Sequence, residues 1–182
     1  MSWSHPEAGR AFARARELGE KLGETNQLLA MLAGLTQSAN GSGQFNLARE
    51  LAERMLATAE RAGDNASLCA AHTIVGRILL APGQYADAQK HLDLGNSYYD
   101  ESNPSELGLM GINALGSGID ALTLAAIVVL LLGFPDRARQ LMTEALRVSE
   151  RRFDPFWTGV VQMWEACSAC CSATGKRFLS TP

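Results

Sequence analysis

The sequence predicts an all-α protein in which antiparallel helix hairpins stack into a solenoid of about seven to eight helices. Three observations support this fold class. Ala, Leu, Glu, Arg and Gln, which all suit helices, dominate the composition. A pattern of small and apolar residues recurs along the chain, and a glycine turn precedes three of its copies. With 47% apolar and 19% charged residues among 182, the chain can bury the core of one domain.

The recurring pattern is an alanine, then an apolar or small residue four positions later, then another three positions after that. The copies are Ala8-Phe12-Ala15, Ala48-Ala52-Met55, Ala88-Leu92-Gly95 and Ala138-Met142-Ala145. This spacing places the three residues of each copy on one stripe of a helix. Successive alanines lie 40, 40 and 50 residues apart, so the third interval holds an elongated connection around 96–117.

A glycine stands five residues before the alanine in three copies, in Gly43-Gln44-Phe45, Gly83-Gln84-Tyr85 and Gly133-Phe134-Pro135. Glycine readily adopts the left-handed backbone that ends one helix just before the next begins. Twelve residues before the same alanines stand Thr36, Gly76 and Ala126. A small residue at this position predicts close approach of the two helices of a hairpin.

We therefore expect one helical domain over 1–172 and a flexible tail over 173–182. The expected helices lie near 6–22, 26–40, 46–62, 66–80, 86–99, 119–132, 135–151 and 156–171. The chain would begin on the second helix of a hairpin and end without a polar capping helix, although solenoids generally need such caps. A fragment of a longer array is one interpretation, and self-association through uncapped ends is another expectation.

The pattern resembles the tetratricopeptide repeat, whose usual period is 34 residues. The segments that carry the resemblance are 13–35, 47–64, 70–92 and 131–146. The longer period here is more similar to the C-terminal repeats of large bacterial signalling ATPases of the cyclase or transcriptional-regulator type. That resemblance implies repeats that work by protein contact, with the chemistry upstream. The glycine-rich stretch 108–120 departs from the polar turn expected in that family.

Charge and hydropathy exclude other classes. The net charge of −3 leaves no basic footprint for nucleic acid. The uncharged segment 121–133 is shorter than the roughly 20 residues that a membrane span needs, so we expect a buried helix there. The first residues lack a signal-peptide pattern, and the four cysteines lack the spacing of a secreted scaffold, so we expect a cytoplasmic location.

No catalytic, cofactor or metal site is expected. His72 and His91 fall on the two helices of one hairpin and could meet, with Cys69 nearby, but no second ligand spacing supports a metal site. The C-terminal cysteines Cys167, Cys170 and Cys171 lack the second pair that zinc requires. The pair at 175–176 lacks the other residues of a phosphate loop. Packing roles are the simpler interpretation.

A partner would lie along the first helices of the hairpins. The positions one and four after the small residue, and three and six before it, are expected to line the groove. The candidate contacts are Gln37, Asn40, Thr73, Arg77, Asp120, Thr123, Ile127 and Leu130, beside Ala30, Ala33, Ala70 and Leu80. Alternatively, the apolar part of this surface is covered by the long connection or the chain end.

The sequence thus favours a non-catalytic interaction scaffold that binds a protein, a peptide or sibling domains of a larger protein. It predicts no cofactor, no nucleic acid and no membrane partner. Two alternatives stay open: a truncated gene product without independent function, and a small enzyme or metal site using His72 and His91.

Overall fold

The computed structural model describes residues 14, 25–99, 118–151 and 156–166. The helices are α2 (Thr25–Gly41), α3 (Phe45–Ala62), α4 (Asn65–Leu80), α5 (Tyr85–Tyr98), α6 (Gly118–Leu131) and α7 (Pro135–Arg151). A further helical segment covers 156–166, and these ranges contain no strand. The all-α class is confirmed. The expected helix at 6–22, the Ala8 copy of the pattern and the tail at 173–182 lie outside the described residues.

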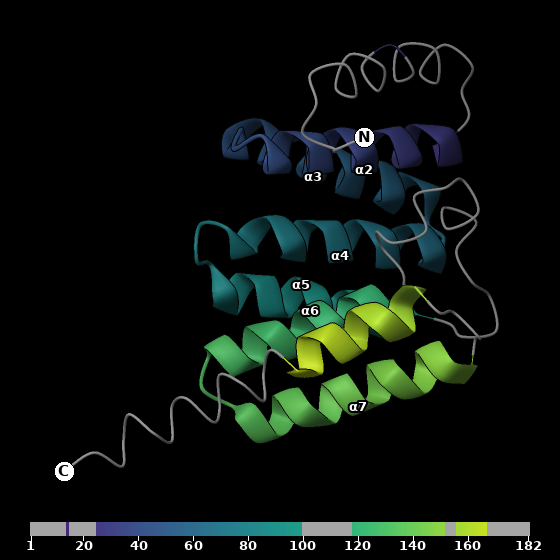
Figure 1. Ribbon diagram of the computed structural model, residues 1–182. Coiled ribbons are helices and arrows are strands. Elements are labelled where there is room, and N and C mark those ends of the chain that lie inside the picture. Colours follow the sequence, from purple (N-terminus) through teal and green to yellow (C-terminus); the bar gives the residue numbers. More distant parts are fainter. Residues whose placement is uncertain (1–13, 15–24, 100–117, 152–155, 167–182) are drawn as a thin grey trace.

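The helices pair in chain order into the hairpins α2–α3, α4–α5 and α6–α7, which stack one on the next (Figure 1). Within the stack, α4 contacts both helices of the hairpin before it, and α6 does the same. The first helices α2, α4 and α6 thereby form one layer, and the second helices α3, α5 and α7 form the other. The predicted helix-hairpin solenoid is therefore the observed architecture.

The repeated stripe forms the part of the core that the second helices contribute. All nine residues of the three described copies are buried. Ala48, Met55, Ala88 and Leu92 are each 0% exposed. An alanine at the first position lets the second helix lie close to its partner, and in the middle copy the larger Leu92 one turn later packs against Gly76 of the same hairpin.

Glycine shapes the three hairpin turns as the sequence predicts. Gly43, Gly83 and Gly133 have φ values of 75°, 76° and 92°, in the left-handed region. In the middle turn, the Gly83 amide donates to the Leu80 carbonyl at 3.0 Å, and the Gln84 amide donates to the Leu79 carbonyl at 3.0 Å. The other two turns repeat these bonds at the equivalent positions. One turn geometry therefore sets the direction of every second helix.

Gly76 shows why a small residue precedes each turn. A Cβ at this position would lie 2.7 Å from Cγ of Leu92 and 3.3 Å from the Ala88 carbonyl oxygen. Leu92 is fully buried, so a shift of its side chain would disturb the packing around it. The contact between α4 and α5 therefore depends on the absence of a side chain at Gly76.

The apolar segment that begins at Ala121 forms most of α6, which lies between the α4–α5 hairpin and α7. Val128 and Ala125 are fully buried. In the ranges that the structure describes, no helix has both the length and the apolar character to cross a bilayer.

Candidate interaction face

Each first helix presents two partly exposed side chains at the same register. They are Gln37 and Asn40 on α2, Arg77 and Leu80 on α4, and Ile127 and Leu130 on α6. These are the positions one and four after the small residue in each repeat. We call these six residues the first-helix face. They form a row because α2 contacts α4 and α4 contacts α6.

The other expected contact positions lie deeper. Thr73 is 0% exposed and Thr123 is 2% exposed. Each threonine hydroxyl donates to the carbonyl four residues earlier, to Cys69 and Ile119 respectively, at 2.7 Å. The two hydroxyls are therefore satisfied within their own helices.

Asp120 is also buried, and it pairs with Arg77. One guanidinium nitrogen of Arg77 contacts both carboxylate oxygens of Asp120, and the side chains are 23% and 4% exposed. This pair joins α4 to α6 across neighbouring hairpins. Sequence reasoning placed both residues at the face but missed their pairing. The sequence signal that could have pointed to the pair was Asp120, the single charged residue near the start of the otherwise uncharged α6.

The first-helix face changes character along the stack. Its α2 end carries the amides of Gln37 and Asn40, and its α6 end carries only aliphatic groups. Two polar atoms there are buried without a hydrogen-bond partner, namely Oδ1 of Asn40 and Nε of Arg77. Buried polar groups generally have partners, so an unpaired acceptor and an unpaired donor are unusual features.

His72 and His91 meet across the α4–α5 hairpin. Their Nδ1 atoms lie 3.0 Å apart, and Tyr98 stacks on His72 with ring centroids 5.8 Å apart. A hydrogen bond between two Nδ1 atoms requires one of them to carry a proton and the other to be bare. The pair of rings is therefore neutral, or it carries one positive charge when the donating ring is protonated at Nε2 as well.

Burial lowers the pKa of both imidazoles. The nearby His91 lowers the pKa of His72 further, whereas Glu60 raises it. For His91, Asp87 raises the pKa and Lys90 lowers it. Burial also raises the pKa of the Cys69 thiol to about 11, so the thiol is protonated at neutral pH.

These groups do not assemble a recognisable centre. The described ranges contain no cluster of three or more His, Cys, Asp or Glu residues able to hold a metal ion. The two imidazoles direct their Nδ1 atoms at each other, and His72 is only 8% exposed. The cysteines at 167, 170 and 171 and the pair at 175–176 lie outside the described residues.

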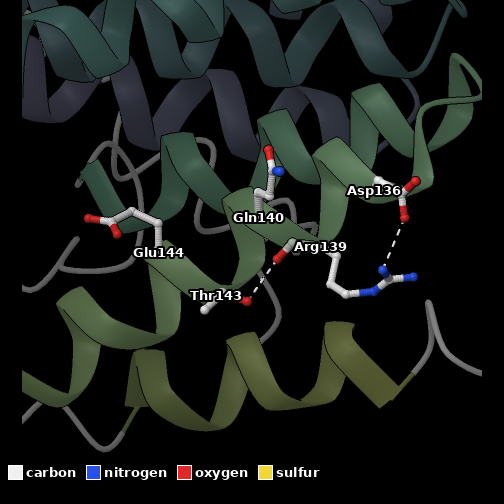
Figure 2. A pocket seen from close by; sticks show the side chains of 5 residues that line it. All are labelled: Asp136, Arg139, Gln140, Thr143 and Glu144. Atoms are coloured by element: carbon white, nitrogen blue, oxygen red, sulfur yellow. Dashed lines mark hydrogen bonds and ion pairs between the residues drawn. The ribbon is translucent and has the colours of Figure 1, made fainter.

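A surface hollow of about 520 Å³ lies along α7 (Figure 2). Its lining residues are Asp136, Arg139, Gln140, Thr143 and Glu144. Arg139 donates to Asp136 at 3.0 Å, and the Thr143 hydroxyl donates to the Arg139 carbonyl at 2.9 Å. All five residues come from one helix, and the Asp136 and Arg139 side chains are 87% and 72% exposed. This arrangement is a solvated helix surface rather than a built binding site.

Comparison with known proteins supports the fold. No family model matches the chain, and no curated protein matches it. Among solved structures, the chain is similar to the apo form of RapI, with a TM-score of 0.63 at 15% sequence identity. The match covers 94% of this chain and 62% of RapI, so the chain spans less than two-thirds of that protein's length. A likeness at this identity shows a shared helical-repeat fold.

Proposed function

We propose that this chain is a non-catalytic scaffold that binds a protein or peptide segment across the first-helix face. The proposal is supported by the row of six partly exposed side chains, two in the same register on each of three stacked helices. A segment lying across this row would contact several hairpins at once. Binding energy would then accumulate from many small contacts over a rigid surface.

The chemistry of the face suits an uncharged extended segment. Because Arg77 is already paired with Asp120, the face offers little net charge for recognition. At the α2 end of the face, the partly exposed amide side chains of Gln37 and Asn40 offer hydrogen-bonding groups to a main chain. The aliphatic Ile127 and Leu130 would receive apolar side chains.

The fuller form of the proposal is that the chain is the repeat part of a multidomain signalling ATPase in the cytoplasm. The partner would then be a sibling domain. The sequence resemblance to such repeats supports this form, and an ATPase reading frame directly upstream would be its simplest support. The competing interpretation is a truncated gene product, for which no partner would depend on the first-helix face.

Catalysis by His72 and His91 is the weaker candidate. The imidazoles do meet through their Nδ1 atoms, which leaves Nε2 as the ring nitrogen that a base would use. A general base must reach a substrate proton, and His72 is only 8% exposed.

Site-directed variants test the scaffold proposal. The chain would be coupled to beads and used to capture partners from cells that express it. It would be compared as wild type and as the face variant, which carries both Gln37→Trp and Ile127→Lys. A matched control carries Arg139→Ala and Thr143→Ala on the solvated surface of α7. We expect a partner whose capture falls at least about tenfold with the face variant and is unchanged by the control. Equal capture by all three proteins, or none, would contradict the proposal.

A further inference from the structure

The side chain of His72 on α4 holds α5 at two places. Its Nδ1 atom lies 3.0 Å from Nδ1 of His91, and its ring stacks on Tyr98 with the two ring planes 15° apart. His91 and Tyr98 have the spacing i and i+7, so they lie on one stripe of α5. Gly95 lies between them, and a Cβ there would meet Oγ1 of Thr73 at 3.1 Å. The C-terminal half of α5 therefore rests on α4 through this stripe.

Beyond Tyr98, the end of α5 is joined to the start of α6. Tyr99 caps α5, and its amide donates to the Asn96 carbonyl at 3.2 Å. The Tyr99 ring lies against Gly118, the first residue of α6, so closely that a Cβ on this glycine would overlap the ring. A change in how α4 holds Tyr98 would therefore reach the contact that positions the start of α6.

The contact between His72 and His91, which we call the histidine pair, admits one added proton but not two. In the neutral pair, one Nδ1 donates its hydrogen to the bare Nδ1 of the other ring. The first added proton can bind Nε2 of the donating ring, which leaves this hydrogen bond in place. The second must bind the accepting Nδ1, because that ring already carries a hydrogen on Nε2. Two N–H groups would then face each other across 3.0 Å with their hydrogens only about 1 Å apart, so the contact must break.

The helices packed around the histidine pair supply few charges. Burial lowers the pKa of both rings, and the α5 ring lowers the pKa of the α4 ring further. Glu60 on α3 raises the pKa of the α4 ring. Asp87 raises the pKa of the α5 ring, whereas Lys90 lowers it. The segment that forms α2 has no ionisable side chain, and Asp120 of α6 is paired with Arg77. Binding of two protons is therefore opposed, and it requires a pH below the ordinary histidine value of about 6.5.

We propose that the histidine pair is an acid-sensitive switch that holds the end of α5. The switch is closed with no added proton or with one, and it opens when the second proton binds. Opening releases Tyr98 from the His72 ring and loosens residues 95–99, while the α2–α3 hairpin keeps its structure. A general loss of stability in acid would instead loosen all the helices together. This inference is independent of the first-helix face.

A pH titration of the full chain tests the switch. Imidazole nitrogen chemical shifts, measured by NMR, count the protons that the histidine pair has bound, and amide hydrogen exchange measures the opening of 95–99. After correction for the intrinsic effect of pH, exchange there should rise at least about tenfold with the second proton and stay unchanged with the first. Amides of α2 and α3 should stay protected in the same samples. Opening with the first proton, no opening with the second, or unfolding of the whole chain in the same step would each overturn the proposal.

His91→Asn is the matched variant. The asparagine side-chain oxygen can take the place of the accepting Nδ1, and it binds no proton in this pH range. His72 can donate to this oxygen in either of its charge states, so residues 95–99 should stay protected throughout the titration. Asp93→Asn, an exposed change on the same helix, should open as wild type does. Acid opening of His91→Asn would mean that the second imidazole is not the trigger. Circular dichroism at neutral pH checks that each variant folds, and the wild-type titration decides the proposal if one does not.

Discussion

Arg77 and Asp120 join the second and third hairpins through one guanidinium nitrogen that contacts both carboxylate oxygens. Asp120 is nearly buried, whereas Arg77 keeps some access to solvent. The pair therefore stabilises the stacking of α6 on α4 only while both charges are present. Removing one partner of such a pair costs far more than replacing both, because a buried charge is left without compensation.

Asp120→Asn should lower the free energy of unfolding by about 2–3 kcal/mol. The loss should be smaller than for a fully buried pair, because solvent reaches Arg77 and partly screens its unpaired charge. The double variant Arg77→Met with Asp120→Leu should be much less destabilised than Asp120→Asn. Urea denaturation followed by circular dichroism measures both. If the two variants lost equal stability, the pair would not be coupled and the interpretation would be wrong.

The sequence could not predict this pair, although both residues were among the candidate groove contacts. Repeat spacing defines position within a hairpin, whereas the contact between Arg77 and Asp120 depends on how one hairpin is displaced along the next. The same limit applies to Thr73 and Thr123. Threonine at those positions is compatible with an open groove or with a hydroxyl that donates to its own helix. Only the three-dimensional structure distinguishes these two arrangements.

The features that were predicted are those set by local geometry. Gly76 followed from its fixed distance to Ala88, and the hairpin glycines followed from their fixed distance to each alanine. Each of these positions depends on one turn and one helix contact. Both recur in every repeat, so a regular spacing in the sequence predicts them. The meeting of His72 and His91 was foreseen as an option, because both lie on one hairpin, but their Nδ1 contact was not.

A second prediction concerns Gly76→Ala. In an exposed helix this change would stabilise by roughly 0.5–1 kcal/mol, since alanine favours helix. Here the added methyl group would meet Leu92 at 2.7 Å, so we expect net destabilisation of about 1–3 kcal/mol. In a Leu92→Ala background the methyl group has room, so Gly76→Ala should cost less stability there than in wild type. Leu92→Ala alone should also destabilise the fold, because it opens a cavity. Thermal unfolding of the three variants forms a double-mutant cycle, and additive losses would contradict a direct clash.

The histidine pair predicts a dependence of stability on pH. The pKa of His72 and that of His91 are both lowered in the folded chain, mainly by burial. Below the unfolded value of about 6.5, the unfolded chain therefore binds more protons than the folded chain does. Stability should fall as pH drops through this window and should level off above it. The charged neighbours Glu60 and Asp87 oppose the shift, and Lys90 adds to it for His91.

His91→Gln isolates this effect. The variant removes one titrating group and the repulsion between two protonated rings. Its melting temperature should therefore fall less than that of wild type between pH 7.5 and pH 5. Asp93→Asn, an exposed change on the same helix, is the control and should follow wild type. A steeper fall for His91→Gln than for wild type would reverse the assigned sign.

The last prediction separates backbone strain from crowding at Gly83. Its φ of 76° is unfavourable for residues with a Cβ, yet a Cβ there would meet no atom within 4 Å. Gly83→Ala should therefore destabilise by about 1–2 kcal/mol through the backbone alone. Gly83→Asn should cost less, because asparagine tolerates the left-handed region better than alanine does, even though it is larger. Urea denaturation of both variants decides the matter. If asparagine were the more damaging substitution, side-chain crowding rather than the left-handed turn would explain why glycine stands before each second helix.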